Sequence, residues 1–119
     1  MRSQTPFNRK REVPVKDGVR RTLDRYKPSI WWYMIVPSQF NPLRGLPDFI
    51  GCWCGRFFYV ETKRQDKKPR RLQQIVHATL NAAGARGWPS VDDAGKFQVE
   101  FDAWAETALA ESPSVKFLP

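Results

Sequence analysis

The spacing of hydrophobic residues changes several times along the chain, and each spacing predicts a different element. Over residues 15–26, apolar side chains recur every three or four positions, which is typical of a helix with one buried stripe. They are Val15, Val19, Leu23 and Tyr26. Residues 30–36 are apolar without interruption. This run is too short to cross a membrane and predicts a strand that is buried on both faces.

The stretch from Gly45 to Lys63 predicts a β-hairpin. Its first strand covers about residues 48–50 and ends at Gly51, and Cys52–Gly55 forms the turn. Its second strand, residues 56–63, is rich in aromatic and β-branched side chains, which suit a half-buried pleated surface.

Another helix is predicted after Pro69, a residue that suits a helix start. Gly84 is a plausible residue for its end. The apolar face of this helix consists of Leu72, Ile75, Val76, Thr79, Leu80 and Ala83. Residues 87–91 predict a strand, and the turn signal of residues 92–95 follows it.

The last part of the chain alternates Phe97, Val99 and Phe101, which predicts a strand over residues 96–101. Asp102 is then expected to cap a final helix. The apolar positions of that helix are Trp104, Ala105, Ala108 and Leu109.

The order helix, strand, hairpin, helix, strand predicts a single compact α/β domain with a mixed central sheet flanked by helices. A chain of 119 residues has room for one such core. We expect residues 1–11 to be a basic flexible arm, residues 12–111 to form the domain and residues 112–119 to be a tail.

Candidate chemistry lies at the open end of the predicted hairpin. Strand alternation points Glu61 and Lys63 to the same side, and antiparallel pairing sets Asp48 level with Glu61. Two carboxylates attract a hard divalent cation such as Mg²⁺. A neighbouring lysine can neutralise the charge that develops on a phosphate during its hydrolysis. This arrangement is typical of a nuclease site.

The spacing also resembles a known family. Pro47-Asp48, twelve further residues and then Glu61-Thr62-Lys63 is similar to the signature of the PD-(D/E)xK nuclease superfamily. The surrounding patterns G-x-P-D-F, G-R-F-F-x-V-E-x-K-R and K-K-P-x-x-L-Q resemble the small stand-alone VRR-NUC proteins of phages and bacteria. The resemblance covers about residues 12–93.

The resemblance implies a restriction-endonuclease-like fold and a metal-dependent DNA endonuclease, with branched junctions as a suggested substrate and a homodimer as a suggested assembly. Asp48, Glu61 and the main-chain carbonyl of Thr62 would hold Mg²⁺ or Mn²⁺. Lys63 would be the catalytic lysine. Gln73 matches a glutamine that lies beside the site in the family, and Glu12 matches a glutamate in its N-terminal helix.

Charge points to the same class of partner. The formal net charge is +8 and the isoelectric point is about 9.9, so a polyanion is the natural ligand. Basic residues that follow or precede the hairpin are expected to grip the DNA backbone. They are Arg44, Arg64, Lys67, Lys68, Arg70 and Arg71. The alternatives to DNA contact are that the basic residues form a solvated surface and that the loop of residues 37–44 only connects two strands.

Other residue types narrow the setting. Cys52 and Cys54 make no disulfide framework, which indicates a reducing, intracellular setting. The family resemblance implies the cytoplasm of a bacterial or phage-infected cell. A zinc site needs four ligands, whereas the one histidine, His77, is far from both cysteines in sequence. His77 falls one helical turn after Gln73 and is interpreted as a packing residue more readily than as a base. No apolar run approaches the length of a membrane span, and we expect no signal peptide because the basic N-terminus lacks an apolar region.

Two further hypotheses concern the aromatic residues. Trp31, Trp32, Tyr33 and Trp53 are more apolar surface than a small core readily buries, so they could form a homodimer interface or simply fill the core. The functional alternative to a nuclease is a non-catalytic basic nucleic-acid-binding protein whose aromatic rings stack on bases. Such a binder has no use for Asp48, Glu61 and Lys63 together.

Overall fold

The computed structural model of the chain describes residues 4–36, 44–63 and 70–112, with the backbone alone for residues 4–13. The elements appear in the predicted order of helix, strand, hairpin, helix and strand, and one more helix follows. Their bounds are α1 Gln4–Asp24, β1 Trp31–Met34, β2 Phe49–Trp53, β3 Arg56–Thr62, α2 Arg71–Ala82, β4 Arg86–Val91 and α3 Ala94–Ala110.

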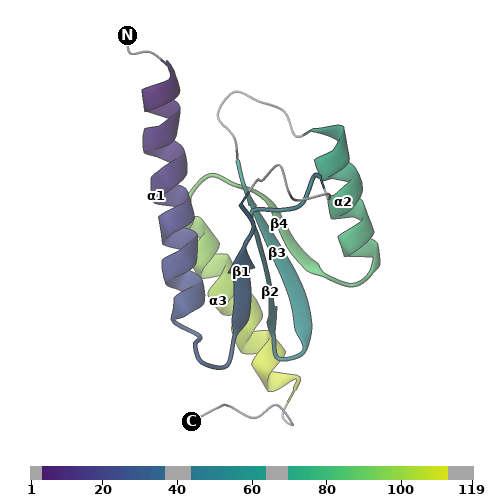
Figure 1. The fold of residues 1–119 in the computed structure, drawn as a ribbon. Coiled ribbons are helices and arrows are strands. Elements are labelled where there is room, and N and C mark those ends of the chain that lie inside the picture. Colours follow the sequence, from purple (N-terminus) through teal and green to yellow (C-terminus); the bar gives the residue numbers. More distant parts are fainter. Residues whose placement is uncertain (1–3, 37–43, 64–69, 113–119) are drawn as a thin grey trace.

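Within the described part of the chain, the strands form one mixed sheet in the order β1-β2-β3-β4. β1, β2 and β3 are antiparallel neighbours, whereas β4 runs parallel to β3 after the crossover through α2. Helices α1 and α3 lie against each other on one side of the sheet, and α2 lies on the other side near β4 (Figure 1). The predicted α/β domain with a mixed sheet flanked by helices is therefore confirmed.

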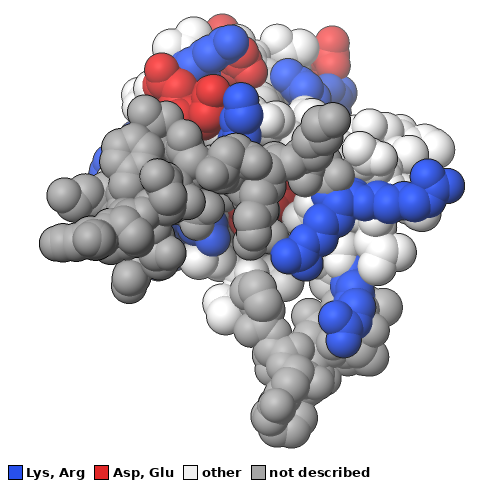
Figure 2. Space-filling view, turned by 90° about the horizontal axis from the view of Figure 1, so that it is seen from above, with Lys and Arg blue, Asp and Glu red and all other residues white. Residues whose placement is uncertain are grey.

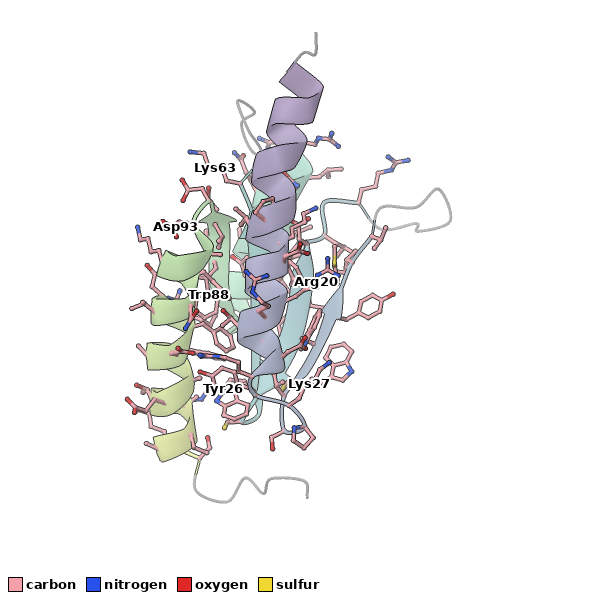
Figure 3. The ribbon with its side chains drawn as sticks, turned by 90° about the vertical axis from the view of Figure 1, so that its left-hand side faces the viewer. Arg20, Tyr26, Lys27, Lys63, Trp88 and Asp93 are labelled. Carbon is pink, nitrogen blue, oxygen red and sulfur yellow. The ribbon has the colours of Figure 1, made fainter. Side chains whose placement is uncertain are left out.

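The main core lies between the sheet and the α1–α3 layer. Alternate residues of β2 and β3, among them Phe49, Phe58 and Val60, are fully buried there. The ring of Phe101 from α3 lies 5.2 Å from that of Phe58 and 5.4 Å from that of Trp88, measured between centroids. Figure 3 shows Trp88 beside α3, and its ring contacts those of Phe97, Phe101 and Trp104.

The strand at residues 31–34 differs from the prediction of a strand buried on both faces. Trp31 and Tyr33 are 57% and 58% exposed, whereas Trp32 and Met34 are partly buried. β1 is an edge strand, and α2 contacts the opposite edge of the sheet. Only the face of β1 that points toward α1 and α3 is therefore covered.

The hairpin turn is shorter than predicted. Cys54 and Gly55 form a two-residue turn with φ angles of 53° and 76°. Positive φ at both central residues is typical of a type I′ turn, whose twist matches that of the paired strands. Cys52 and Trp53, which the sequence assigned to the turn, extend β2. Trp53 is buried, and its indole N–H donates to the main-chain oxygen of Ala105 at 3.0 Å.

The prediction of a strand at residues 96–101 is wrong, because α3 begins at Ala94. Asp93, rather than Asp102, caps this helix by accepting a hydrogen bond from the main-chain N–H of Lys96 at 3.1 Å. Phe97 and Phe101 lie four residues apart on its buried side, whereas Val99 is 70% exposed. Alternation over so short a segment does not distinguish a strand from one side of a helix.

The N-terminal helix begins at Gln4, well before the predicted start at residue 15. Residues 4–11, predicted as part of a flexible arm, are helical. In Figure 1 the first turns of α1 extend beyond the end of the sheet. Residues 4–11 carry no apolar stripe in the sequence, so periodicity does not reveal the helix there.

A substitution at Gly51 tests how closely β2 packs against its neighbours. A Cβ atom at this position would lie 2.4 Å from Cζ of Phe58 and 2.6 Å from the main-chain oxygen of Trp31. We expect Gly51→Ala to lower the free energy of unfolding by about 1–3 kcal/mol, because neighbouring groups must shift. Urea unfolding measures this loss.

The matched control is Val99→Ala on the exposed side of α3, which should change the free energy of unfolding by at most about 0.5 kcal/mol. Equal losses in the two variants would contradict the packing described for Gly51.

Candidate active site

The hairpin register sets Asp48 level with Glu61, as the sequence predicts. Phe49 of β2 pairs with Val60 of β3, so the residue before Phe49 lies across from the residue after Val60. Both carboxylates therefore belong to the end of the sheet from which the chain leaves β3 toward α2.

Thr62 holds the carboxylate of Asp48. One oxygen, Oδ2, accepts a hydrogen bond from the main-chain N–H of Thr62 at 2.8 Å and another from its hydroxyl at 2.6 Å. The other oxygen, Oδ1, lies 4.0 Å from Nζ of Lys16 in α1. Asp48 is only partly buried, so its carboxylate is held in place and still reaches solvent.

Glu61 is the more deeply buried carboxylate, with 7% of its surface exposed. Two of its contacts come from α2. Nε2 of Gln73 donates to Oε2 of Glu61 at 3.4 Å, and Nε2 of His77 lies 3.6 Å from Oε1. Gln73 and His77 lie one turn apart, so a single side of α2 faces this carboxylate, as the helical spacing predicts.

The side-chain alternation of β3 divides these contacts between two faces of the sheet. Thr62 shares its face with Phe58 and Val60, which point toward α1 and α3. Glu61 shares the other face with Tyr59, which packs against α2. The site therefore joins three elements: the hairpin, α1 through Lys16 and α2 through Gln73 and His77.

His77 is locked in place by packing. Its imidazole stacks on the ring of Tyr59 with 4.9 Å between centroids, and the Tyr59 hydroxyl donates to Oδ1 of Asn81 at 2.9 Å. Burial lowers the pKa of His77 and so favours the neutral form of the imidazole beside Glu61.

Lys63 lies just beyond the end of β3 and is exposed. Its main-chain N–H donates to the oxygen of Val91 at 2.7 Å, which extends the pairing with β4. The register shifts between Val60 and Thr62, since they pair with Trp88 and Val91, so β4 carries an extra residue there. Figure 3 shows Lys63 at the same end of the molecule as Asp93, at the start of α3.

The predicted DNA-binding residues are only partly described. Arg44, Arg70 and Arg71 are exposed, and the last two are at the start of α2. Figure 2 looks down on this end of the molecule and shows Lys and Arg side chains projecting from it. Residues Arg64, Lys67 and Lys68 lie outside the described residues, as does the side chain of Glu12, whose backbone belongs to α1.

Gly45 brings the start of α2 against the chain that leads into β2. A Cβ atom on Gly45 would lie 2.8 Å from the main-chain carbon and oxygen of Leu72, and Gly45 has a φ angle of 80°. Only glycine combines this backbone angle with so close an approach. Gln73, the next residue of α2, is thereby held near Glu61.

The donor set suits a hard cation, although it is small. Carboxylate oxygens at Asp48 and Glu61 are ligands that Mg²⁺ and Mn²⁺ prefer. In the described part of the chain, no three side chains of His, Cys, Asp and Glu gather closely enough to hold a metal ion. A metal here would therefore need further ligands, such as a main-chain oxygen or water, as the family resemblance implies for Thr62.

Sequence reasoning missed Lys16. It interpreted His77 as a packing residue, which agrees with the stacking on Tyr59 but leaves out the contact with Glu61. No sequence signal marks Lys16, because its approach to Asp48 depends on how α1 packs against the sheet. His77 carried a signal, since its helical spacing from Gln73 predicts that both residues lie on one side of α2.

No protein-family model, curated protein or solved structure matches the chain. The nuclease function therefore stays a prediction, which depends on the residues of the motif and on their arrangement.

The contacts of Asp48 generate a testable prediction. Thr62→Val keeps the shape and the main-chain N–H of Thr62 but removes the hydroxyl that donates to the carboxylate. We expect the free energy of unfolding to fall by about 1.5–3 kcal/mol, the range for hydrogen bonds to charged groups. Urea unfolding of this variant is compared with that of Thr107→Val, which removes an exposed hydroxyl from α3. An equal effect of the two substitutions would show that the Asp48 contact contributes nothing.

Proposed function

We propose that this protein is a metal-dependent endonuclease that hydrolyses DNA phosphodiesters. The observation that carries the proposal is the level placement of Asp48 and Glu61 at one end of the hairpin, with separate residues holding each carboxylate. The resemblance of the Pro47-Asp48 and Glu61-Thr62-Lys63 motifs to PD-(D/E)xK nucleases supports it. The net charge of +8 favours DNA as the substrate.

In this proposal Asp48 and Glu61 hold Mg²⁺ or Mn²⁺, which when bound lowers the pKa of a water molecule and polarises a phosphoryl oxygen. The N–H and hydroxyl of Thr62 keep the Asp48 carboxylate in one orientation. Gln73 does the same for Glu61 from the side of α2. Lys63 neutralises negative charge that develops on the phosphate in the transition state.

An alternative function is binding of nucleic acid without cleavage. It is favoured by the exposure of Trp31 and Tyr33, since large exposed rings offer surfaces on which bases stack. Cleavage distinguishes the two functions. A panel of labelled linear, single-stranded, flapped and four-way DNAs, incubated with Mg²⁺ or Mn²⁺, also gives the structural preference of a nuclease.

A homodimer stays a prediction, and the structure narrows the surface available for it. Trp53 belongs to the core, and the indole N–H of Trp32 donates to Asp24 at 3.1 Å. Of the four aromatic residues considered for an interface, Trp31 and Tyr33 are the largely exposed ones. Cytoplasmic location likewise stays a prediction. None of the helices that the structure describes combines the length and the hydrophobicity of a membrane span.

The first prediction from this proposal concerns the metal. DNA cleavage should require Mg²⁺ or Mn²⁺ and stop on addition of a chelator, whereas Ca²⁺ should support binding with little turnover. Asp48→Asn and Glu61→Gln should each slow cleavage by roughly 10²–10³-fold, the scale for removal of one charge-stabilising group. Glu106→Gln, an exposed change on α3, is the control and should cut at the wild-type rate. Full activity in excess chelator would rule out the metal mechanism.

Lys63 should act on the chemical step. We expect Lys63→Ala to lower kcat by about 10²–10³-fold with little change in DNA affinity, because its charge matters most in the transition state. Single-turnover rates and binding in Ca²⁺ separate these quantities. Lys27→Ala is the matched control, since Figure 3 shows Lys27 at the opposite end of the molecule from Lys63. Cleavage at the wild-type rate by Lys63→Ala would leave this lysine as a surface charge.

The exposed arginines at the start of α2 should act on affinity. Arg70→Ala with Arg71→Ala should weaken DNA binding and reduce the slope of log affinity against log salt by roughly 0.9 for each phosphate that the protein no longer neutralises. Arg20→Ala with Lys27→Ala is the control, because it also removes two positive charges. In the structure these two side chains pair with Asp17 and Asp24. An unchanged slope in the Arg70→Ala, Arg71→Ala variant would show that these two arginines contact solvent and no phosphate.

A further inference from the structure

One half of the sheet face on the α2 side carries aromatic side chains that α2 does not cover. The strand register arranges this face in rows across β1, β2 and β3. Trp31, Cys52 and Phe57 form one row. Tyr33, Ile50 and Tyr59 form the next row, nearer to the level of Asp48 and Glu61.

Each row is most exposed at its β1 end. Tyr59 is fully buried under His77 of α2, whereas Phe57 is 37% exposed and Trp31 and Tyr33 are more than half exposed. Helix α2 packs toward the β4 edge of the sheet, far from β1 (Figure 1). The open part of this face, defined by Trp31, Tyr33 and Phe57, is called the aromatic face.

The geometry of the aromatic face suits flat ligands. Trp31 and Tyr33 are two residues apart on one strand, so they stand on the same side, about 7 Å apart along it. Bases of unpaired nucleic acid stack on such rings, and each stack contributes about 1–3 kcal/mol whatever the base. Four-stranded sheets that present two or three aromatic rings bind single-stranded bases in this way.

Charge and position favour nucleic acid over a second copy of the chain. The rows lead toward Glu61, which follows Tyr59 on the same face of β3, and exposed Arg44, Arg70 and Arg71 lie at that end. The three rings of the aromatic face offer roughly 300 Å² between them. A stable protein interface needs about 800 Å² from each partner. Single-stranded DNA needs only the rings and nearby positive charge.

We propose that the aromatic face binds the unpaired bases of a single-stranded DNA segment and leads that strand toward Asp48 and Glu61. This inference rests on the proposed nuclease function. It specifies the substrate of that nuclease as DNA in which a single-stranded branch adjoins a duplex. Trp31 and Tyr33 are the stacking residues and determine specificity for the unpaired strand.

The test measures binding in Ca²⁺, by fluorescence anisotropy of a labelled oligo-dT and of a blunt duplex. Trp31→Ala with Tyr33→Ala should lower the affinity for oligo-dT by at least about 25-fold, since removal of each of the two stacks is worth a factor of about five or more. Affinity for the duplex should stay within about twofold. Trp31→Phe with Tyr33→Phe keeps two rings and should keep most of the single-strand affinity. Val99→Ala is the control away from the aromatic face.

A second measurement does not depend on how well the alanine variant folds. Oligo-dT should quench part of the tryptophan fluorescence of the wild type, and the quenching should largely disappear in Trp31→Phe although binding persists. Unchanged quenching in Trp31→Phe would overturn the proposal, as would an equal decrease of oligo-dT and duplex affinity in the double alanine variant.

Two outcomes separate this inference from the nuclease proposal. If no DNA is cut but single-strand binding depends on Trp31 and Tyr33, the catalytic function fails and the aromatic face stands. If DNA is cut and the two rings have no effect on single-strand binding, the inference alone fails. Light scattering tests whether a second copy of the chain occupies the aromatic face instead. A wild-type dimer that dissociates in the double alanine variant would overturn the proposal.

Discussion

The antiparallel pairing of β2 with β3 is the constraint on which both the core and the candidate site depend. The two-residue turn at Cys54 and Gly55 sets its register, because only one pairing of the strands continues from such a turn. A shift by one residue would turn Phe58 and Val60 toward α2 and bury Glu61 in the apolar layer under α3. The cost of that exchange specifies the register and, with it, the level placement of Asp48 and Glu61.

Helix α2 links this register to the chemistry. Gln73 has two roles: its Oε1 accepts a hydrogen bond from the main-chain N–H of Arg70 at 3.0 Å, at the helix start, and its Nε2 donates to Glu61. Stacking of His77 on Tyr59 anchors the same side of the helix one turn later. The side chain that caps the beginning of the helix therefore also contacts the buried carboxylate. The position of α2 on the sheet thus fixes the orientation of Glu61.

The unequal cover of the two sheet faces follows from size. A helix with its side chains is about 10 Å wide, and neighbouring strands are about 4.8 Å apart, so one helix covers about two strands. Two helices, α1 and α3, cover the first face, whereas α2 is the one helix on the second among the residues that the structure describes. The strands nearest α2 are covered and β1 is left open. Trp31 and Tyr33 are exposed for this geometric reason, and their exposure creates the surface to which we assign the unpaired strand.

Local patterns in the sequence determined the hairpin, the helix after it, the strand at residues 87–91 and the level placement of Asp48 with Glu61. These features depend on neighbours in the chain: a turn for the hairpin, and Gly84 with its φ angle of 99° after the last turn of α2. The predicted apolar face of α2 is wrong in part, because Leu72 and Ile75 are about half exposed and His77 is the buried residue of this helix. The position of Gln73 beside Glu61 was expected from the family resemblance, and in the structure the close approach of Gly45 to Leu72 holds it there.

Tertiary structure decided the rest. The apolar run at residues 30–36 is the same whether its strand is central or at an edge, and only the strand order distinguishes them. Phe97 and Phe101 became helical because a helix presents both rings to one side of the core. Lys16 reaches Asp48, and Asp102 binds Arg25 and Tyr26, only because α1 packs against both the sheet and α3. Such contacts join residues far apart in the chain, and a pattern that repeats over a few residues carries no information about them.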